Sequence, residues 1–440
     1  MASFATSDQR QNDGLVRAVG LSTFSFTICF AVWTIFSIIG VRIKQDLGLN
    51  DTEFGFLVGL PILVGSLIRL VLGIWAEQFG GRRVLLLVMV AGAVSTWLLS
   101  YATTYPAFLL AALGVGISGG SFAVGIAYVA DFAPAARKGT VLGIFGMGNV
   151  GAAVTKFVAP FVMVAFGWTM VAQVWAVGLL VTAVLFFVLS EDEPSLKARR
   201  ASGARGQSFT EQLKPLASLQ VWRFSLYYFF VFGAFVALAL WLPRYYVGVY
   251  DLDIRVAGML GAAYSIPGSM FRVVGGVLSD KVGARRVMYW TFIVSVICTF
   301  FLSYPATEYV VHGIKGDIQF SFEIGLVPFT ILTFILGFFM SLGKAAVYKH
   351  IPVYFPNNVG SVGGVVGMIG GLGGFVLPFA FGFMNDVTGV WTSCFMLLFL
   401  LVTIALVWMH FAIRRMERRQ IPSLRGPQYL PELAENMKKN

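Results

Sequence analysis

The sequence predicts an all-α polytopic membrane protein, with twelve transmembrane helices in two pseudo-symmetric six-helix bundles and both termini in the cytoplasm. Its 440 residues are 58% hydrophobic and only 12% charged, against a usual charged share of about 25%, and the mean hydropathy is +0.80. The apolar residues form continuous runs of about 20, enough to cross a bilayer. This composition excludes a soluble enzyme, a secreted disulfide scaffold and a disordered chain, and unbroken runs exclude an outer-membrane barrel.

Twelve apolar runs follow one another along the chain. They cover roughly residues 19–43, 53–76, 83–103, 106–131, 139–166, 168–190, 221–246, 256–279, 286–305, 323–350, 359–385 and 389–413. Each can cross about 30 Å of hydrocarbon at about 1.5 Å of helix rise per residue. No cleavable signal peptide is visible, so we expect the first run to be the first span and its own insertion signal.

The Lys and Arg residues set the orientation, because cytoplasmic loops carry an excess of them. Four of the 32 lie deep within apolar runs, away from the run ends: Arg69, Lys156, Arg272 and Lys344. If both termini share one side, only five lie on the opposite side: Arg42, Lys44, Arg244, Arg255 and Lys315. This asymmetry predicts cytoplasmic termini in a multi-pass protein of the cell inner membrane, and it explains the net charge of +11 without any nucleic-acid partner.

The longest polar connection halves the chain. We expect a cytoplasmic N-terminal segment over 1–18, a six-helix bundle over 19–190, a cytoplasmic linker over 191–219, a second bundle over 220–413 and a cytoplasmic tail over 414–440. The three cysteines, Cys29, Cys298 and Cys394, lie inside apolar runs without metal or redox spacing, and we interpret them as core residues.

The two halves repeat a charged motif at the end of their second spans. The first copy reads RLVLGIWAEQFGGRR from Arg69, and the second reads RVVGGVLSDKVGARR from Arg272. The acids Glu77 and Asp280 both fall eight residues after their arginine. These loops resemble the cytoplasmic loop signature of the major facilitator superfamily, and the resemblance covers nearly the whole chain. It implies a cytoplasmic gate formed by Glu77, Arg82, Arg83, Asp280, Arg285 and Arg286.

Arg69 and Arg272 are predicted near the middle of the membrane, about 12 Å of helix rise from the acid that ends each span. A charge at that depth costs roughly 2.5–3.5 kcal/mol on insertion scales, and no Asp or Glu lies at a comparable depth. A mobile anion is the simplest partner; arginines bonded to carbonyls or snorkelling are the alternative. A guanidinium presents a planar fork of donors, so two could grip one small trigonal anion from both edges.

Aromatic residues are expected to line the rest of the cavity. The candidates are Phe30, Trp33, Phe122, Tyr228, Phe232 and Phe235, although a single aromatic in a membrane helix is more often plain packing. Two further helices are rich in glycine, which lets helix backbones approach closely. The glycines concerned are Gly146, Gly148 and Gly151 in one, and Gly367, Gly370, Gly371 and Gly373 in the other. Asn149 lies between Gly148 and Gly151 of the first helix. Its side-chain amide could donate a hydrogen bond to an anion or bond a neighbouring helix.

The motif set resembles the nitrate/nitrite porter family. The matching segments are GGSF at 119–122, GMGNVG at 146–151, YFFVFGAF at 228–235 and GGVVGMIGGLGG at 363–374, together with the two arginines. The resemblance implies that Arg69 and Arg272 bind nitrate, that Phe122 and Phe232 stack on its faces, that Tyr228 and Asn149 donate hydrogen bonds, and that Phe30 completes the cage. The resemblance also implies that nitrate, nitrite and protons are the transported species. It implies a monomer surrounded by membrane lipid, with no cofactor and no metal.

The sequence leaves open whether nitrate transport is coupled to protons or to the exchange of nitrite. Lys344 and Lys156 are candidates for proton coupling and favour the importer type, although Lys344 could be a structural cation and Lys156 could snorkel outwards. Repulsion between two unneutralised arginines in an empty site favours nitrate/nitrite exchange instead. An anion channel is a weaker alternative because of the duplicated gate loops. An enzyme is not expected, since the sequence has no metal cluster, nucleophile–base pair or phosphate loop.

Overall fold

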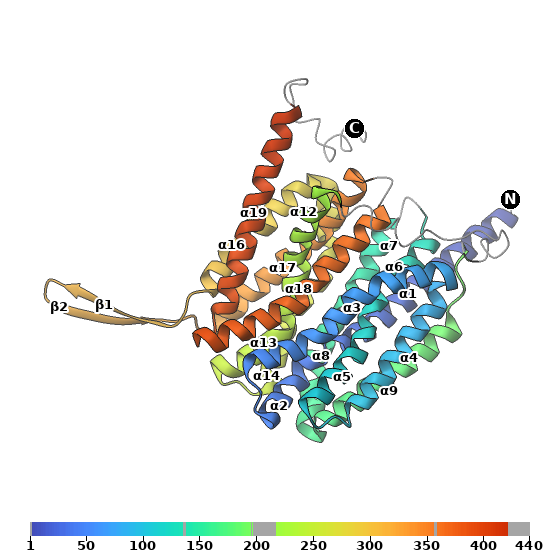
Figure 1. The fold of residues 1–440 in the computed structure, drawn as a ribbon. Helices are drawn as coiled ribbons and strands as arrows, with labels where there is room; N and C mark the ends of the chain where they lie inside the picture. The colour runs from blue at the N-terminus through green and yellow to red at the C-terminus, as the bar shows by residue number, and fades with distance from the viewer. Residues whose placement is uncertain (1, 135–137, 195, 197–216, 356–358, 421–440) are drawn as a thin grey trace.

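The computed structural model describes residues 2–134, 138–194, 196, 217–355 and 359–420. Almost all of the described chain is helical, and the helices form one bundle in which the N-terminal end of α1 and the C-terminal end of α19 lie at the same end (Figure 1). We call that end the cytoplasmic side and the other the outer side, following the distribution of Lys and Arg.

The N-terminal half contains six crossings, three of them interrupted. Their elements are α1 (Ala2–Trp33) with α2 (Phe36–Leu47), α3 (Asp51–Phe79), α4 (Gly81–Leu99), α5 (Tyr105–Gly116) with η1 (Ile117–Gly120) and α6 (Ser121–Phe132), α7 (Lys138–Gly146) with η3 (Met147–Val150) and α8 (Gly151–Phe166), and α9 (Trp168–Leu189). The first helix begins at Ala2, well before the apolar run expected from residue 19.

The C-terminal half repeats this order. Its elements are α12 (Leu219–Tyr228) with the π-helix η5 (Phe229–Ala234) and α13 (Phe235–Tyr250), α14 (Ile254–Met270) with α15 (Arg272–Leu278) and the π-helix η6 (Ser279–Gly283), α16 (Ala284–Leu302), α17 (Leu326–Tyr354), α18 (Val359–Thr388) and α19 (Ser393–Gln420).

The described residues contain eleven continuous stretches long and apolar enough to cross a membrane. The longest of them, Ile254–Leu302, holds two crossings, because the chain reverses at Gly283, whose φ of 91° is open to glycine but strained for other residues. Gly80, with a φ of 93°, makes the same turn in the other half. The structure therefore confirms the predicted all-α membrane architecture with twelve crossings.

One outer connection differs from the sequence prediction, which gave it no secondary structure. Thr307–Gly313 (β1) pairs antiparallel with Gly316–Phe322 (β2) to form a hairpin. It projects from the bundle at the end opposite the C-terminus (Figure 1). Most of the predicted linker 191–219 and of the tail 414–440 lies outside the described residues, so those domain boundaries stay predictions.

The two halves meet most closely where glycines face the backbone of another helix. A Cβ added at Gly55 of α3 would lie 2.1 Å from the carbonyl oxygen of Pro378 in α18, and one added at Gly258 of α14 would lie 2.3 Å from that of Lys156 in α8. Within the N-terminal half, a Cβ at Gly151 would lie 2.0 Å from the carbonyl oxygen of Thr27. Only glycine lets these helices approach so closely.

We expect Gly151→Ala to destabilise the protein by about 1–3 kcal/mol, because the methyl group meets backbone that cannot move aside. Gly143→Ala is the matched control in the same crossing, since a Cβ there meets nothing within 4 Å. Thermal unfolding of the purified protein in detergent measures both. Equal melting temperatures for the two variants would contradict the packing described.

Candidate functional site

The structure brings the two buried arginines to one aromatic ring. Arg69 lies in α3 and Arg272 is the first residue of α15; they are 6% and 8% exposed. The guanidinium carbon of Arg69 lies 5.1 Å from the centroid of Phe122, and that of Arg272 lies 6.0 Å from the same centroid. One positive charge from each half therefore reaches a common point inside the bundle.

Neither guanidinium pairs with a carboxylate among the described residues. Arg69 donates from Nη1 to the carbonyl oxygen of Gly367 at 3.2 Å. Nε of Arg69 and Nη1 of Arg272 are buried without a hydrogen-bond partner. Buried donors on charged groups are costly when left unsatisfied, so the site has donors and positive charge available for an anion.

Aromatic rings surround the guanidinium pair. Trp33 and Phe232 lie 5.6 and 5.7 Å from the guanidinium carbon of Arg69, and the ring of Tyr348 lies 5.6 Å from that of Arg272. Tyr228 stacks on Phe232 at 5.1 Å between centroids and meets the Tyr348 ring edge-on at 5.0 Å. These faces place partial negative charge against the cations.

Phe30 contacts two other aromatic residues of α1. Its ring packs at 5.2 Å against Trp33 and at 5.7 Å against Phe26. Trp33 occupies the position beside Arg69, held by its indole N–H, which donates to the carbonyl oxygen of Pro61 at 2.7 Å. Trp33 was among the candidate aromatics, whereas nothing in the sequence analysis singled out Tyr348. Tyr348 follows Lys344 by one helical turn, and that spacing could have identified it.

Each arginine rests on the glycine-rich helix of the opposite half. A Cβ at Gly146 of α7 would lie 3.2 Å from Nη1 of Arg272, and one at Gly371 of α18 would lie 3.4 Å from Nη1 of Arg69. Gly370 makes room for the Tyr228 ring, which would come within 2.3 Å of a Cβ there. The predicted glycines Gly148 and Gly373 serve helix packing against Phe26 and Gly233.

Asn149 is fully buried in η3, and neither atom of its side-chain amide has a hydrogen-bond partner. The alternative of a bond to a neighbouring helix is therefore not realised among the described residues. An amide oxygen and nitrogen left unpaired in a protein interior carry a desolvation cost that a polar ligand can remove.

Several site residues lie at interruptions of their helices. Trp33 ends α1, Phe122 follows the 3₁₀ turn η1, Asn149 lies in η3 and Phe232 in the π-helix η5. Arg272 follows Phe271, the residue that caps the C-terminus of α14 four residues after Pro267. Irregular helix turns are frequent at functional sites because they redirect side chains and free backbone groups.

The two deep lysines occupy different places. Lys344 of α17 is buried, donates to the carbonyl oxygen of Gly268 at 2.7 Å, and lies 3.1 Å from the ring centroid of Phe235. Lys156 of α8 is also buried and bonds Ser265 of the opposite half at 2.9 Å. Lys156 therefore does not snorkel to the surface, and it bridges the two halves.

Two of the predicted cytoplasmic gate residues, Arg82 and Asp280, form ion pairs within their own halves. Arg82 pairs with Asp192 at 3.3 Å and donates to the carbonyl oxygen of Phe187, and Asp280 pairs with Lys349 at 2.9 Å. Arg83 and Arg286 are exposed and Arg285 is half-buried, whereas the Glu77 side chain lies outside the described residues. Beside this loop, Glu193 accepts a hydrogen bond from the backbone N–H of Gly81, and burial raises the pKa of its carboxyl.

A polar cluster joins the halves at the outer side, and the sequence analysis missed it. The carboxylate of Asp51, at the start of α3, pairs with Lys44 at 3.1 Å and with Arg244 of the opposite half at 3.5 Å, and it accepts a hydrogen bond from Asn385 of α18. Asp386 accepts from the backbone N–H groups of Asp51 at 3.0 Å and Thr52 at 2.7 Å. The C-terminal half thus caps the first turn of α3. We call Lys44, Asp51, Arg244, Asn385 and Asp386 the outer latch.

Comparison with known proteins places these features in a family. The Major Facilitator Superfamily model matches residues 21–314 and 254–435. The chain is 41% identical over 431 residues to the "Probable nitrate/nitrite antiporter NarK1" of Thermus thermophilus, covering 95% of this chain and 96% of that protein. It is 30% identical over 400 residues to the "Nitrite extrusion protein" of Bacillus subtilis, covering 90% and 95%.

Solved structures show the same fold. A bacterial homologue of the human lysosomal transporter Spinster, in an inward-facing and unoccupied conformation, matches with a TM-score of 0.69 over 91% of this chain and 97% of that one. The sequences are only 16% identical.

We expect Asp51→Asn to weaken closure of the outer side, because the amide loses the ionic attraction to Lys44 and Arg244. Spin labels at Leu47→Cys and Val249→Cys, in a background lacking the three native cysteines, report the separation of the two halves by pulsed electron paramagnetic resonance. Asp46→Asn is the control, since Asp46 pairs at 3.0 Å with Arg42 in its own half. The expected result is a longer-distance population in Asp51→Asn alone; unchanged distances would contradict a latch.

Proposed function

This chain belongs to the nitrate/nitrite porter family of the Major Facilitator Superfamily, and from this membership we propose that it carries nitrate, and also nitrite, across the inner membrane as a secondary active transporter. The observation that carries the proposal is the pair of buried guanidinium groups at Phe122 that no described carboxylate neutralises. The names of its relatives, a nitrate/nitrite antiporter and a nitrite extrusion protein, agree with this substrate class.

Nitrate fits the donors of the site. It is flat and carries one charge over three oxygens, so a guanidinium fork on each edge can donate two hydrogen bonds. The unpaired Nε of Arg69, Nη1 of Arg272, the Asn149 amide and the Tyr228 hydroxyl, which is also buried without a partner, are the donors proposed to bind it. Phe122 and Phe232 are proposed to cover its faces. Chloride has no edges to engage a fork and is expected to compete poorly.

Alternating access follows from the arrangement of contacts between the halves. The outer latch and the bond from Lys156 to Ser265 hold the outer side together. Of the cytoplasmic gate residues, Arg82 and Asp280 pair within their own halves. We propose that the latch opens and the cytoplasmic loops pair across the halves when the carrier faces outwards.

Arg69→Lys and Arg272→Lys test the binding site. A lysine keeps the charge but loses the fork, so we expect each change to cost about 2–3 kcal/mol, roughly a 30- to 150-fold rise in the Kd for nitrate. Titration calorimetry of purified protein measures it. Arg255→Lys is the control, because Arg255 is an exposed residue that pairs with Asp253. Nitrate affinity unchanged in either site variant would overturn the assignment.

For the coupling we propose nitrate import together with protons, through a change in protonation of Lys344. This lysine is the buried base nearest the site, 5.9 Å from the ring of Phe232, and the carbonyl that it bonds, Gly268, lies one turn before Arg272. The second candidate is exchange of nitrate for nitrite. The absence of a described carboxylate beside the arginines favours it, because two unneutralised cations resist reorientation of an empty carrier.

Lys344→Gln separates the two mechanisms in proteoliposomes. If Lys344 carries the proton, the variant loses nitrate uptake driven by an imposed pH gradient but keeps exchange against internal nitrite. Lys315→Gln, at the tip of the outer hairpin, is the matched control and should retain both activities. Wild-type uptake that needs internal nitrite and ignores the pH gradient would establish exchange instead. Loss of gradient-driven uptake in Lys156→Gln alone would assign the proton to Lys156.

A further inference from the structure

The outer hairpin has one apolar and one polar face. The cross-strand pairs alternate: Tyr309 opposes Phe320 and Val311 opposes Ile318 on one face, with Phe322 at the base. Successive residues of a strand point to opposite faces, so Glu308, His312, Asp317, Gln319 and Ser321 share the other face, with Val310. The ring stacking of Tyr309 on Phe320 at 5.2 Å and the ion pair of His312 with Asp317 at 2.7 Å agree with this division.

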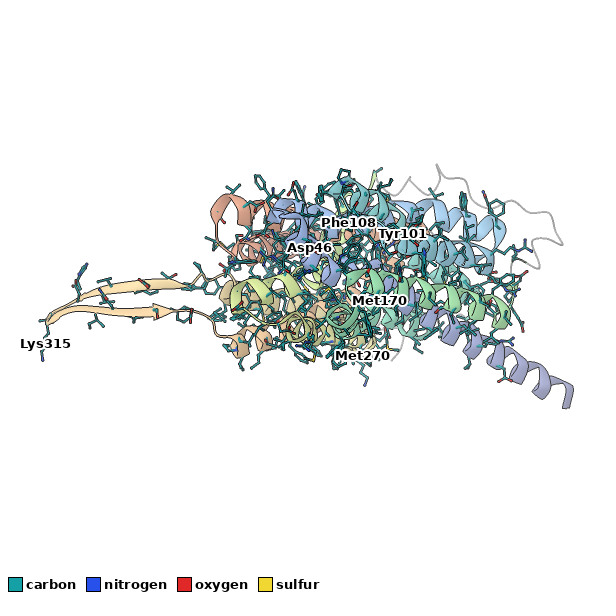
Figure 2. All side chains as sticks on the ribbon, turned by 90° about the horizontal axis from the view of Figure 1, so that it is seen from below. Asp46, Tyr101, Phe108, Met170, Met270 and Lys315 are labelled. Atoms are coloured by element: carbon teal, nitrogen blue, oxygen red, sulfur yellow. The ribbon has the colours of Figure 1, made fainter. Side chains whose placement is uncertain are left out.

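The apolar face is uncovered in the chain itself. The side chains of Val311, Ile318 and Phe320 are 47%, 59% and 50% exposed, and Ile314 at the turn is fully exposed. The hairpin projects away from the helices in both views, with Lys315 at its tip (Figures 1 and 2). An isolated two-stranded hairpin is marginally stable in water, and a contiguous exposed apolar surface marks a site of interaction.

The position of the hairpin indicates what covers that face. It follows Leu302, the outer end of α16, after four residues and leads into α17 at Leu326, so both its ends lie at the edge of the bilayer. The sides of these helices are apolar and exposed, as expected for contact with lipid, through Ile297, Phe300 and Phe301 of α16 and Val327 and Ile331 of α17. The apolar face of the hairpin continues this surface through Phe322, whose ring packs at 4.9 Å on Tyr304.

We propose that the hairpin lies on the outer leaflet of the membrane, with the face of Tyr309, Val311, Ile318 and Phe320 in the headgroup and upper acyl region. In Figure 1 its long axis runs across the direction of α19, as this placement requires. Glu308, His312 and Asp317 then face water, Tyr309 occupies the interfacial zone that aromatic side chains favour, and Lys315 reaches the lipid phosphates. The hairpin thus anchors the start of α17, the helix that carries Lys344 and Tyr348, to the lipid surface.

An environment-sensitive fluorophore tests the placement at neighbouring positions of one strand. Ile318→Cys and Gln319→Cys are labelled separately with the dye NBD, in a background lacking the three native cysteines. The protein is reconstituted into vesicles of phosphatidylethanolamine and phosphatidylglycerol that contain a lipid with a nitroxide near its headgroup. We expect the nitroxide to quench position 318 at least about twofold more than position 319, with a blue-shifted emission at 318. Iodide in the buffer should quench 319 more.

Phe320→Cys and Ser321→Cys repeat the comparison at a second pair, and nitrate uptake by each labelled protein verifies that it is folded. Equal quenching by the nitroxide lipid at the two positions of both pairs would overturn the proposal, as would preferential iodide quenching at 318 and 320. Protection of 318 and 320 from both quenchers would also overturn it, because a protein surface rather than lipid would then cover the face.

Discussion

Two positive charges held deep in the membrane, with no described carboxylate beside them, are the constraint on which the arrangement of this protein depends. Each is costly in that environment, and the structure reduces the cost only in part. Aromatic faces surround Arg69 and Arg272, and one carbonyl, that of Gly367, accepts from Arg69. The unsatisfied Nε and Nη1 atoms retain the rest of the cost. In the proposed function, an anion of matching shape removes that cost on binding, so the same feature that destabilises the empty site provides the affinity.

In the outer latch, unlike the central site, the positive charges are paired with a carboxylate. Lys44 and Arg244 are also partly buried cations, yet both reach Asp51, and Asn385 completes the group. Their charge is neutralised within the protein, so no ligand is needed there. A carrier that locks by internal ion pairs at one end and leaves its central cations unpaired can hold a closed face while it keeps its affinity for a mobile anion. The distribution of carboxylates therefore distinguishes the latch from the site.

The duplicated arginine motif made the fold, and the meeting of the two arginines at one ring, predictable from the sequence. Arg69 and Arg272 occur at equal offsets from Glu77 and Asp280, so pseudo-symmetry alone places them at equal depth. The aromatic residues that contact the two arginines were less predictable. Trp33, which contacts Arg69, is the last residue of α1, and Phe232 lies in the π-helix η5, and neither helix interruption is predictable from the apolar runs. The outer latch was missed because Asp51 and Asp386 lie at the ends of spans, where single charges are ordinary.

For the two glycine-rich helices, glycine content predicted the close packing of the helices better than any single residue predicted a contact. Their glycine content predicts helices that approach their neighbours closely, and the structure shows which groups lie against them. Gly146 and Gly371 border the guanidinium groups of Arg272 and Arg69, each from the opposite half. A methyl group at Gly146 would crowd Nη1 of Arg272, whereas one at Gly371 would meet the Ser66 hydroxyl first. Because each arginine contacts the glycine helix of the other half, any rocking of one half against the other moves both arginines relative to those helices. In the proposed transport cycle, closure around the anion and movement of the halves are therefore linked through these two contacts.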